Sequence, residues 1–440
     1  MNNKIKIFIL SLLFVSGCSQ EPEIDHKFTI AVIPDTQNIV DYTHQLDKGF
    51  PVDGAAMFLE HMQYIAGNTK ARGGEIEFVT SVGDVWQHTD NVIDPAHYER
   101  GLRPLNTEPA DISEHLTGIK NFELPLSKRG YEILSETGVV FSVVPGNHDY
   151  TTTWFDSEFP RDVNRMAELM DINGRLVGAD PMITGMRHYG GYENFNGVFG
   201  EDSEFFNGKS WYISSFNGGA NSAQIFEAGG YKFLHFGFEM QAGQDVINWA
   251  QGVIDANPGL PTLMSTHDFI QPDGSRSARA WIDFARVDPT AHISAEEIWQ
   301  KFLSKNDQIF MVLSGHNQGQ AFRNDKNDFG NSVYQLLSDY QGRGQSANPA
   351  PDAPQLGISD GWLRLMEFDM SGNIPIINVR TYSTYYEKFS IDMPEYVSWY
   401  RDLEQPNMTD QEFIDADHFT IELNDFKKRF GEPQMEEKTK

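Results

Sequence analysis

The chain has 440 residues, with 34 Lys and Arg against 63 Asp and Glu, and a formal net charge of −29. Its length is enough to bury a large core. The acidic balance argues against a nucleic-acid partner, because phosphate contacts need clustered Lys and Arg. It also argues against electrostatic docking on anionic lipid. A phosphate substrate would need local positive charge, for which bound metal ions are the obvious source.

The first residues predict a secretory signal. Lys4 and Lys6 precede a short apolar run that ends in Ser16-Gly17-Cys18-Ser19. A basic start, a short apolar core and small residues form a secretory signal, and the run is too short to span a membrane as a mature helix. A signal peptide cleaved elsewhere is the alternative. Cys18 is the only cysteine, so any lipidation there leaves no thiol for a disulfide or for a metal.

The segment Val-Ser-Gly-Cys resembles the bacterial lipoprotein box. The resemblance implies a signal peptide over residues 1–17, a lipid on Cys18 and a short tether over 18–27. Ser19 in place of Asp favours the outer membrane, where the lipid would be the contact with the membrane and the chain would lie in the cell envelope.

The predicted elements alternate strand and helix over the first 150 residues, which indicates parallel strand pairing. Strands are predicted at 28–33, 78–82 and 140–144, with helices at 55–66 and 126–134 between them. Further along, strands are predicted at 211–214, 224–226, 231–238, 262–267 and 309–314, and helices at 245–254 and 295–303. Segments 333–337, 362–368 and 374–382 are expected to close a second, mostly antiparallel layer, and 418–423 is one more strand.

Nothing before about residue 380 has the composition of a linker. We therefore expect one domain over 28–384, with insertions at about 86–125 and 150–210. Residues 385–440 form an acidic, aromatic extension packed on that domain, with a frayed end.

Polar side chains lie at or just after the ends of five of the predicted strands. They are Asp35 and Gln37, Asp84, Asn147 with His148, His267, and His316 with Gln318. The carboxyl ends of parallel strands meet at one edge of a sheet, so these side chains should converge. Mixed carboxylate, amide and imidazole donors suit Mn, Fe, Zn or Mg. Asp84 can bridge two ions, the arrangement used for in-line attack on phosphorus.

The order of these motifs resembles the calcineurin-like metallophosphoesterase family, whose pattern is Asp-x-His, Gly-Asp, Gly-Asn-His-Asp/Glu, a lone His and Gly-His-x-His. Gly83-Asp84, Gly146-Asn147-His148-Asp149, His267 and Gly315-His316 match it in order, over roughly residues 28–382. Each motif alone is weak evidence for this family, but the motifs together and in this order are strong evidence for the resemblance. The resemblance implies a four-layer α-β-β-α sandwich with two mixed central sheets, two divalent metal ions and hydrolysis of phosphate esters.

Two positions depart from the family. Gln37 and Gln318 stand where it has histidines, and by its assignment both histidines serve the same metal. One site would keep Asp84, Asn147, His267 and His316, while the other would have Asp35, Gln37, Asp84 and Gln318. Amide oxygens are hard, weak donors, so the second site should be weaker and prefer Mg, Ca or Mn. Gln37 and Gln318 as turn residues that bind a water is the alternative.

By the same resemblance, a hydroxide held between the ions would attack phosphorus. His148 would protonate the leaving alkoxide or stabilise the phosphoryl oxygen, and Asp149 would orient the His148 ring. Asn147 would also lie against substrate. His88 is expected at the rim. Loop residues that could clamp a phosphate are Arg161, Arg187, His188, Tyr189, Arg276 and Arg279, of which Arg187 and Arg276 are the chosen candidates, although solvated arginines are the default.

The predicted function is therefore metal-dependent hydrolysis of a small or polymer-linked phosphate ester outside the cytoplasm, with no protein partner predicted. Monoester and diester are not distinguished. A non-catalytic metal-binding lipoprotein on the same fold stays open. So does a hydrolase of sulfate esters or of phosphate esters linked to polysaccharide or lipid.

Overall fold

A computed structural model describes residues 25–89, 95–101, 113–155, 162–166, 183, 185, 187–276, 282–348 and 356–433. The predicted signal peptide with Cys18, and the loop residues Arg161 and Arg279, lie outside these ranges. No helix within them is long and apolar enough to cross a membrane.

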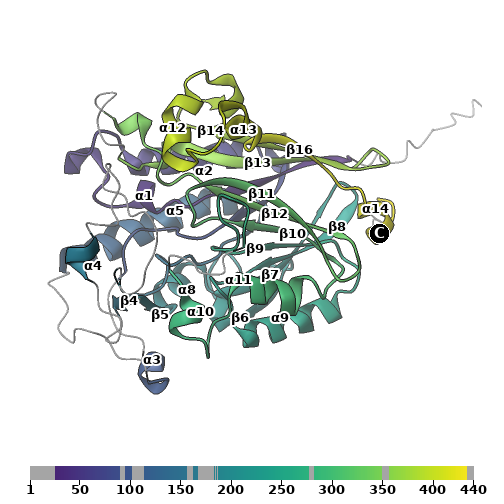
Figure 1. Ribbon diagram of the computed structural model, residues 1–440, viewed down its shortest axis with the longest axis horizontal. Coiled ribbons are helices and arrows are strands. Elements are labelled where there is room, and N and C mark those ends of the chain that lie inside the picture. Colours follow the sequence, from purple (N-terminus) through teal and green to yellow (C-terminus); the bar gives the residue numbers. More distant parts are fainter. Residues whose placement is uncertain are drawn as a thin grey trace, which may run out of the picture.

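Two mixed seven-stranded sheets form the centre of the molecule (Figure 1). The first sheet has the order β15-β14-β13-β1-β2-β3, with β16 beside β14, and the second has the order β11-β12-β10-β9-β8-β7-β6. The strands of the first sheet are β1 Lys27–Ile33, β2 Ile76–Ser81, β3 Val140–Ser142, β13 Trp362–Asp369, β14 Ile376–Ser383, β15 Lys388–Phe389 and β16 His418–Glu422. Those of the second are β6 Tyr212–Phe216, β7 Asn221–Ala228, β8 Tyr231–Gly237, β9 Thr262–Ser265, β10 Ile309–Ser314, β11 Gly319–Lys326 and β12 Ser332–Asp339.

The remaining described elements are mostly short. β4 Thr152–Phe155 and β5 Arg187–Gly190 form a small separate sheet within the predicted second insertion. The α-helices are α1 Gln37–Val40, α2 Gly54–Gly67, α3 Pro95–Glu99, α4 Ser113–Gly118, α5 Leu124–Ser135, α6 Val163–Met166, α8 Glu193–Phe199, α9 Gln244–Ala256, α10 Phe284–Val287, α11 Ala295–Ile298, α12 Tyr396–Glu404, α13 Asp410–Asp415 and α14 Phe426–Phe430. Single π-helical turns at Ile119–Glu123 (η3) and Trp299–Leu303 (η6) precede α5 and follow α11.

Three hydrophobic cores separate four layers. The side chains of a strand alternate between two of these cores, because successive side chains point to opposite faces of the sheet. In β1, Ala31 and Ile33 pack with α2 and α5, whereas Ile30 and Val32 pack against the second sheet. On the other side of the second sheet, α9 and α11 cover a third core with side chains such as Met264. The predicted α/β sandwich with two mixed central sheets is confirmed.

Two expectations about the strands are wrong. β13 and β14 do not join the strand at 333–337 in a second layer, because β13 pairs antiparallel with β1 in the first sheet. β11 was not expected at all. Its segment 319–326 has polar or charged residues at most positions. It is held as an edge strand by its pairing with β12 along its whole length.

The registers of the parallel strands bring their carboxyl ends level. Ile33 pairs with Ser81, Thr80 with Ser142, Ser265 with Leu313, and Ser314 with Leu337. Each of these strands is followed within a few residues by a polar side chain. The loops after β1, β2 and β3 therefore open at one edge of the first sheet, and those after β9, β10 and β12 at one edge of the second. A hydrogen bond from His267 Nδ1 to the carbonyl oxygen of Val82 joins the two edges.

Candidate metal centre

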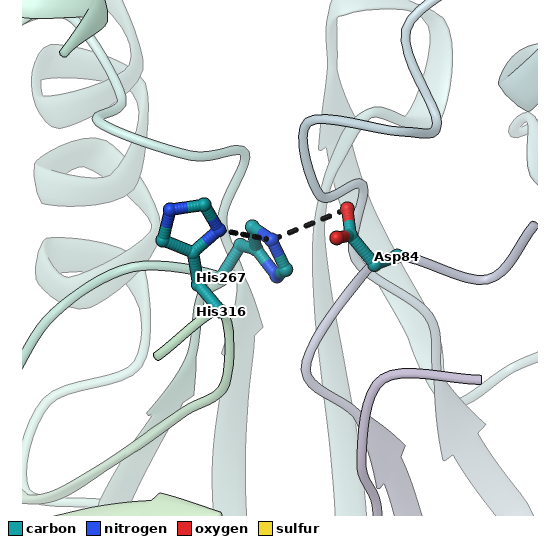
Figure 2. A group of neighbouring side chains, drawn as sticks. All are labelled: Asp84, His267 and His316. Carbon is teal, nitrogen blue, oxygen red and sulfur yellow. Dashed lines mark hydrogen bonds and ion pairs between the residues drawn. The ribbon is translucent and has the colours of Figure 1, made fainter. Parts of the chain in front are cut away.

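Four donor atoms from both sheets meet where these two edges join. His267 Nε2 lies 3.1 Å from Asn147 Oδ1, 3.2 Å from Asp84 Oδ1 and 3.0 Å from His316 Nδ1. Figure 2 shows Asp84 on a loop of the first sheet, facing the two histidines on loops of the second. We call these four residues the first half-site. Spacings of about 3.4 Å are expected between the ligands of one tetrahedral ion with bonds of about 2.1 Å, slightly longer than these three distances.

The hydrogen bonding of His267 leaves its Nε2 as the atom that faces this group. Its Nδ1 lies 2.8 Å from the carbonyl oxygen of Val82 and donates to it. Such a bond from the second ring nitrogen to a carbonyl is the usual support of a metal-bound histidine. Because the amide and carboxylate oxygens around Nε2 are acceptors, the first half-site fits a cation.

The loops hold these residues in unusual backbone conformations. Asp84 and His316 have left-handed φ angles of 51° and 69°. Non-glycine residues seldom adopt this region, and at roughly 1–3 kcal/mol each such strain gathers at functional sites. The glycines beside them leave room for the carboxylates. A Cβ on Gly146 would lie 2.2 Å from Asp84 Oδ1, and one on Gly315 would lie 2.2 Å from Asp35 Oδ1.

Asp84 connects this group to a second one through its other oxygen. Gln37 Nε2 donates to Asp84 Oδ2 over 3.1 Å and to the side-chain oxygen of Gln341. Gln37 is buried, and its Oε1 has no hydrogen-bond partner among the described residues. Asp35 is also fully buried and accepts from the backbone N–H of His316. An unpartnered buried oxygen beside two carboxylates suits a hard cation.

Asp339 completes this second half-site, and the sequence analysis missed it. Asp339 is the last residue of β12, which pairs with β10, and its charge acts on the carboxyl of Asp35. Asp339 is fully buried, and its Oδ2 accepts from Gln341 Nε2 over 3.2 Å. We define the second half-site as Asp35, Gln37, Asp84 and Asp339. The rule of polar residues at strand ends would have found Asp339, had the strand been extended from 337 to 339.

The carboxylates of the two half-sites repel one another electrostatically, and this repulsion contributes to their pKa values. Burial raises the pKa of Asp35 well above its usual range, and the charge of Asp339 raises it further. Burial likewise raises the pKa of Asp339 to about 7. Burial alone would lower the pKa of His267, but Asp84 and Asp35 outweigh it and raise that pKa to about 10. The neighbouring acids thus favour a positive charge on or beside the His267 ring. A divalent cation would supply that charge when it replaces the proton on the ring.

The pKa values of His316 and Asp84 are both lowered, for different reasons. Burial and the neighbouring His267 lower the pKa of His316 to about 3, so its imidazole is neutral and able to act as a ligand. Burial disfavours the ionised form of Asp84, but His267 and His148 outweigh burial and lower the pKa of Asp84. Asp84 is therefore a carboxylate at neutral pH.

His148 lies beside Asp84 and reaches solvent. Its side chain is 31% exposed, and its Nε2 is 4.0 Å from Asp84 Oδ2. Its Nδ1 lies 2.5 Å from the carbonyl oxygen of Gln87 and donates to it, which turns Nε2 toward the centre.

The expected pairing of Asp149 with the His148 ring is wrong. Asp149 is fully buried, and its carboxylate accepts from the backbone N–H groups of Val85, Trp86 and Gly146. Burial and the charge of Asp84 raise its pKa to about 8. Asp149 therefore ties the loop after β2 to the loop after β3, and the Gln87 carbonyl orients His148.

The remaining predicted site residues lie apart from these contacts. Gln318 is exposed, and its amide lies against Gly342, next to Gln341. The guanidinium of Arg276 is bound by Glu296 at 2.7 Å and Asp325 at 2.5 Å, so its expected role as a phosphate clamp is wrong. Arg187 lies on β5 and lines a small cavity with neighbours that include His188 and Tyr189.

His88 belongs to a different group of possible metal ligands. It lies with Asp41 and Glu123, and the donor atoms of the three residues are all within 4.8 Å of one another. Asp41 and Glu123 were not singled out in the sequence, because neither follows a predicted strand or matches a motif. Asp41 follows the short helix α1, and Glu123 ends a π-helical turn.

Comparisons with known proteins give distant similarities. No protein-family model matches the chain. The uncharacterized protein YvnB of Bacillus subtilis (strain 168) is 24% identical over 265 residues, which are 58% of this chain and 15% of that protein, so the chain spans less than a fifth of this relative. A dimetal phosphatase from Danio rerio is similar over 80% of this chain and 95% of that chain, with 10% identity and a TM-score of 0.36. A 5'-nucleotidase from Candida albicans is similar over 92% of this chain and 53% of that chain, with 11% identity and a TM-score of 0.27. At this level of similarity, the chemistry has to be argued from the side chains of this chain.

Proposed function

We propose that the chain is a metal-dependent hydrolase of phosphate esters, of the calcineurin-like type that its motifs resemble. The observation that carries the proposal is the convergence of Asp84, Asn147, His267 and His316 on one point, with His148 beside them at the surface. The first half-site would hold one divalent cation and the second half-site another, with Asp84 belonging to both. When bound, two such ions activate water and offset the charge that develops on the phosphoryl oxygens.

The residues of the chain have separate tasks in this reaction. His148 is held by Gln87 with Nε2 toward the centre, so in its protonated form it can donate a proton to the leaving alkoxide. Asp84, Asn147 and His267 are buried while His316 and His148 are partly exposed, so substrate approaches from the side of these two histidines. Asp149 positions both loops and touches no substrate.

The assay that tests the function is hydrolysis of p-nitrophenyl phosphate and of the bis ester, after loading the protein with Mn²⁺, Zn²⁺ or Mg²⁺. We expect turnover with one of the two substrates, and a fall in kcat of about 10²–10⁴-fold in His148→Ala. His418→Ala, a partly buried histidine on β16, is the matched control and should keep the wild-type rate. No turnover with any metal, or an unchanged rate in His148→Ala, would refute the proposed function.

The alternative is a non-catalytic metal-binding protein. It is favoured by the amide group of Gln37, which occupies Asp84 Oδ2 with a hydrogen bond. It predicts a cation in the first half-site only and no turnover. Counting bound Mn²⁺ in the loaded protein, alongside the ester assay, separates the two proposals. Hydrolysis of sulfate esters or of phosphate esters linked to polysaccharide or lipid would appear in a substrate panel.

We also propose that the protein is exported and lipidated at Cys18, from the signal-like residues that precede it. Cells that express the full chain should incorporate labelled palmitate into it. Cys18→Ser should remove the label and release the protein from the membrane fraction, and a labelled Cys18→Ser variant would contradict this assignment.

A further inference from the structure

The group formed by Asp41, His88 and Glu123 lies outside both half-sites and has the composition of a metal site. Asp41 follows α1, His88 follows β2, and Glu123 ends the π-helical turn before α5. Their donor atoms lie within 4.8 Å of one another, although the residues are far apart in the sequence. Two carboxylates and one imidazole suit Zn²⁺ or Mn²⁺, and three protein ligands leave a fourth position for water.

The two acids of the group are buried, and the basic side chains beside them are histidines. Asp41 is 4% exposed and Glu123 is fully buried. Glu123 Oε1 lies 2.7 Å from His88 Nδ1, and the nearest basic atom to Asp41 is His44 Nε2, at 3.9 Å. Within the described ranges, no lysine or arginine makes an ion pair with either acid. Two carboxylates this close inside a protein repel one another unless a cation lies between them.

The rings next to His88 enclose the group. His115 stacks on His88 with ring centroids 4.7 Å apart, and its Nδ1 lies 3.0 Å from Tyr42 Oη. Tyr42 also donates its backbone N–H to Glu123. Asp41 Oδ1 accepts from both the N–H and the hydroxyl of Thr43, at 2.7 Å each, which fixes the direction of the carboxylate. The ligands are thus held in place by neighbours, as in metal sites whose ligands are themselves hydrogen-bonded.

We infer that Asp41, His88 and Glu123 bind a third divalent cation, which has a structural role. The cation would clamp together the segment after α1, the loop after β2 and the turn Ile119–Glu123. The first two segments also reach the metal centre. Asp41 donates its N–H to the carbonyl of Gln37, and Gln87, which orients His148, precedes His88. Binding at this third site does not depend on the proposed function.

The test counts Zn²⁺ bound to the full chain after removal of metal by a chelator, reloading with excess Zn²⁺ and gel filtration. His88→Gln should bind one Zn²⁺ fewer than the wild type. The double variant Asp84→Asn/His267→Ala, in which the first half-site is disabled, should still bind one and lose it when His88→Gln is added. His418→Gln is the matched histidine control and should bind as many ions as the wild type.

Zn²⁺ should also raise the Tm of the double variant by a few °C, since a ligand bound only to the folded state stabilises it. If His88→Gln fails to fold by circular dichroism, Glu123→Gln replaces it in the same count. An equal Zn²⁺ count in the wild type and His88→Gln, or no Zn²⁺ in the folded double variant, would leave only the His88–Glu123 ion pair and overturn the inference. A missing esterase activity together with a Zn²⁺ ion that depends on His88 would refute the proposed function alone.

Discussion

Gly146 and Gly315 matter in this protein for the space they leave. Each lies next to a candidate ligand loop, and a Cβ at either position would overlap a carboxylate oxygen at 2.2 Å. The Gly-Asn-His-Asp and Gly-His motifs therefore combine ligands with the room for a ligand from another strand. This reason for the glycines cannot be found in the local sequence, because Asp84 and Asp35 come from different segments.

Gly146→Ala should displace the Asp84 carboxylate and lower both metal affinity and ester hydrolysis, by about 10-fold or more, since a ligand held out of place by its surroundings costs 10–100-fold. Gly252→Ala on α9 is the matched control, because a Cβ there meets nothing within 4 Å. Zn²⁺ titration monitored by calorimetry measures the change. Equal affinities in the two variants would contradict this account of Gly146.

Asp339 is the residue whose role changes most when the structure is known. It ends β12, its charge acts on Asp35, and Gln341 connects it to Gln37. Asp339→Asn should weaken the second cation by about 10–100-fold and leave the first in place. Activity lost in Asp339→Asn should therefore return at higher Mn²⁺ concentration. Asp369→Asn, at the half-exposed end of β13, is the control, and a loss that no Mn²⁺ concentration restores in Asp339→Asn would count against a ligand role.

Among the helices, α2 contains a buried histidine that couples stability to pH. His61 is fully buried on α2, and neither ring nitrogen has a hydrogen-bond partner among the described residues. Burial lowers the pKa of His61 to about 4. The folded state therefore binds this proton less readily than the unfolded state, whose histidine has a pKa of about 6.5. The stability due to the neutral ring is complete above pH 6.5 and is lost as the pH falls toward 4.

His61→Phe should remove this dependence. Between pH 7 and pH 4, the wild type should lose up to about 3 kcal/mol of unfolding free energy that the variant keeps. Urea unfolding at pH 7, 5.5 and 4 gives the comparison, and His418→Phe on β16 serves as the control. If the difference between wild type and His61→Phe is the same at every pH, the buried neutral histidine does not explain the acid sensitivity.

At the scale of the whole molecule, a network of buried charged and polar side chains connects the C-terminal residues to both sheets. Asp417, which precedes β16, accepts from Arg364 on β13 at 2.6 Å, from Thr381 on β14 at 2.8 Å and from Tyr340 after β12 at 2.9 Å. Tyr396 on α12 donates to its other oxygen. Figure 1 shows α12 and α13 beside β13, β14 and β16 at one end of the molecule. Because Tyr340 follows Asp339, this network also supports the second half-site.

Asp417→Asn should lower the unfolding free energy by about 3–5 kcal/mol, because it leaves Arg364 buried without its counter-charge. Asp415→Asn, an exposed aspartate two residues earlier, should change it by no more than about 0.5 kcal/mol. Urea titration of the two variants and the wild type makes the measurement. Similar losses in both variants would show that the network does not anchor the C-terminal residues.

The amino-acid sequence by itself determined the elements that carry strong periodicity. β1, β2, β10, α2 and α9 were predicted to within a few residues, because apolar runs and helical spacing are local signals. The strand ends at Asp35, Asp84, Asn147, His267 and His316 were found for the same reason, since each follows a buried strand. These residues were enough to predict the convergence that the structure contains.

Only the tertiary structure decided which residues complete the sites. Asp339 was missed because the end of a strand is ill-defined in sequence, and Asp41 and Glu123 because their segments meet only in the folded chain. The contacts predicted for Asp149 and Arg276 were wrong, because a sequence motif does not show which backbone N–H groups or distant carboxylates a side chain will meet. The physical reason is the same throughout: a side chain of a given type gains its chemistry from neighbours far away in the sequence.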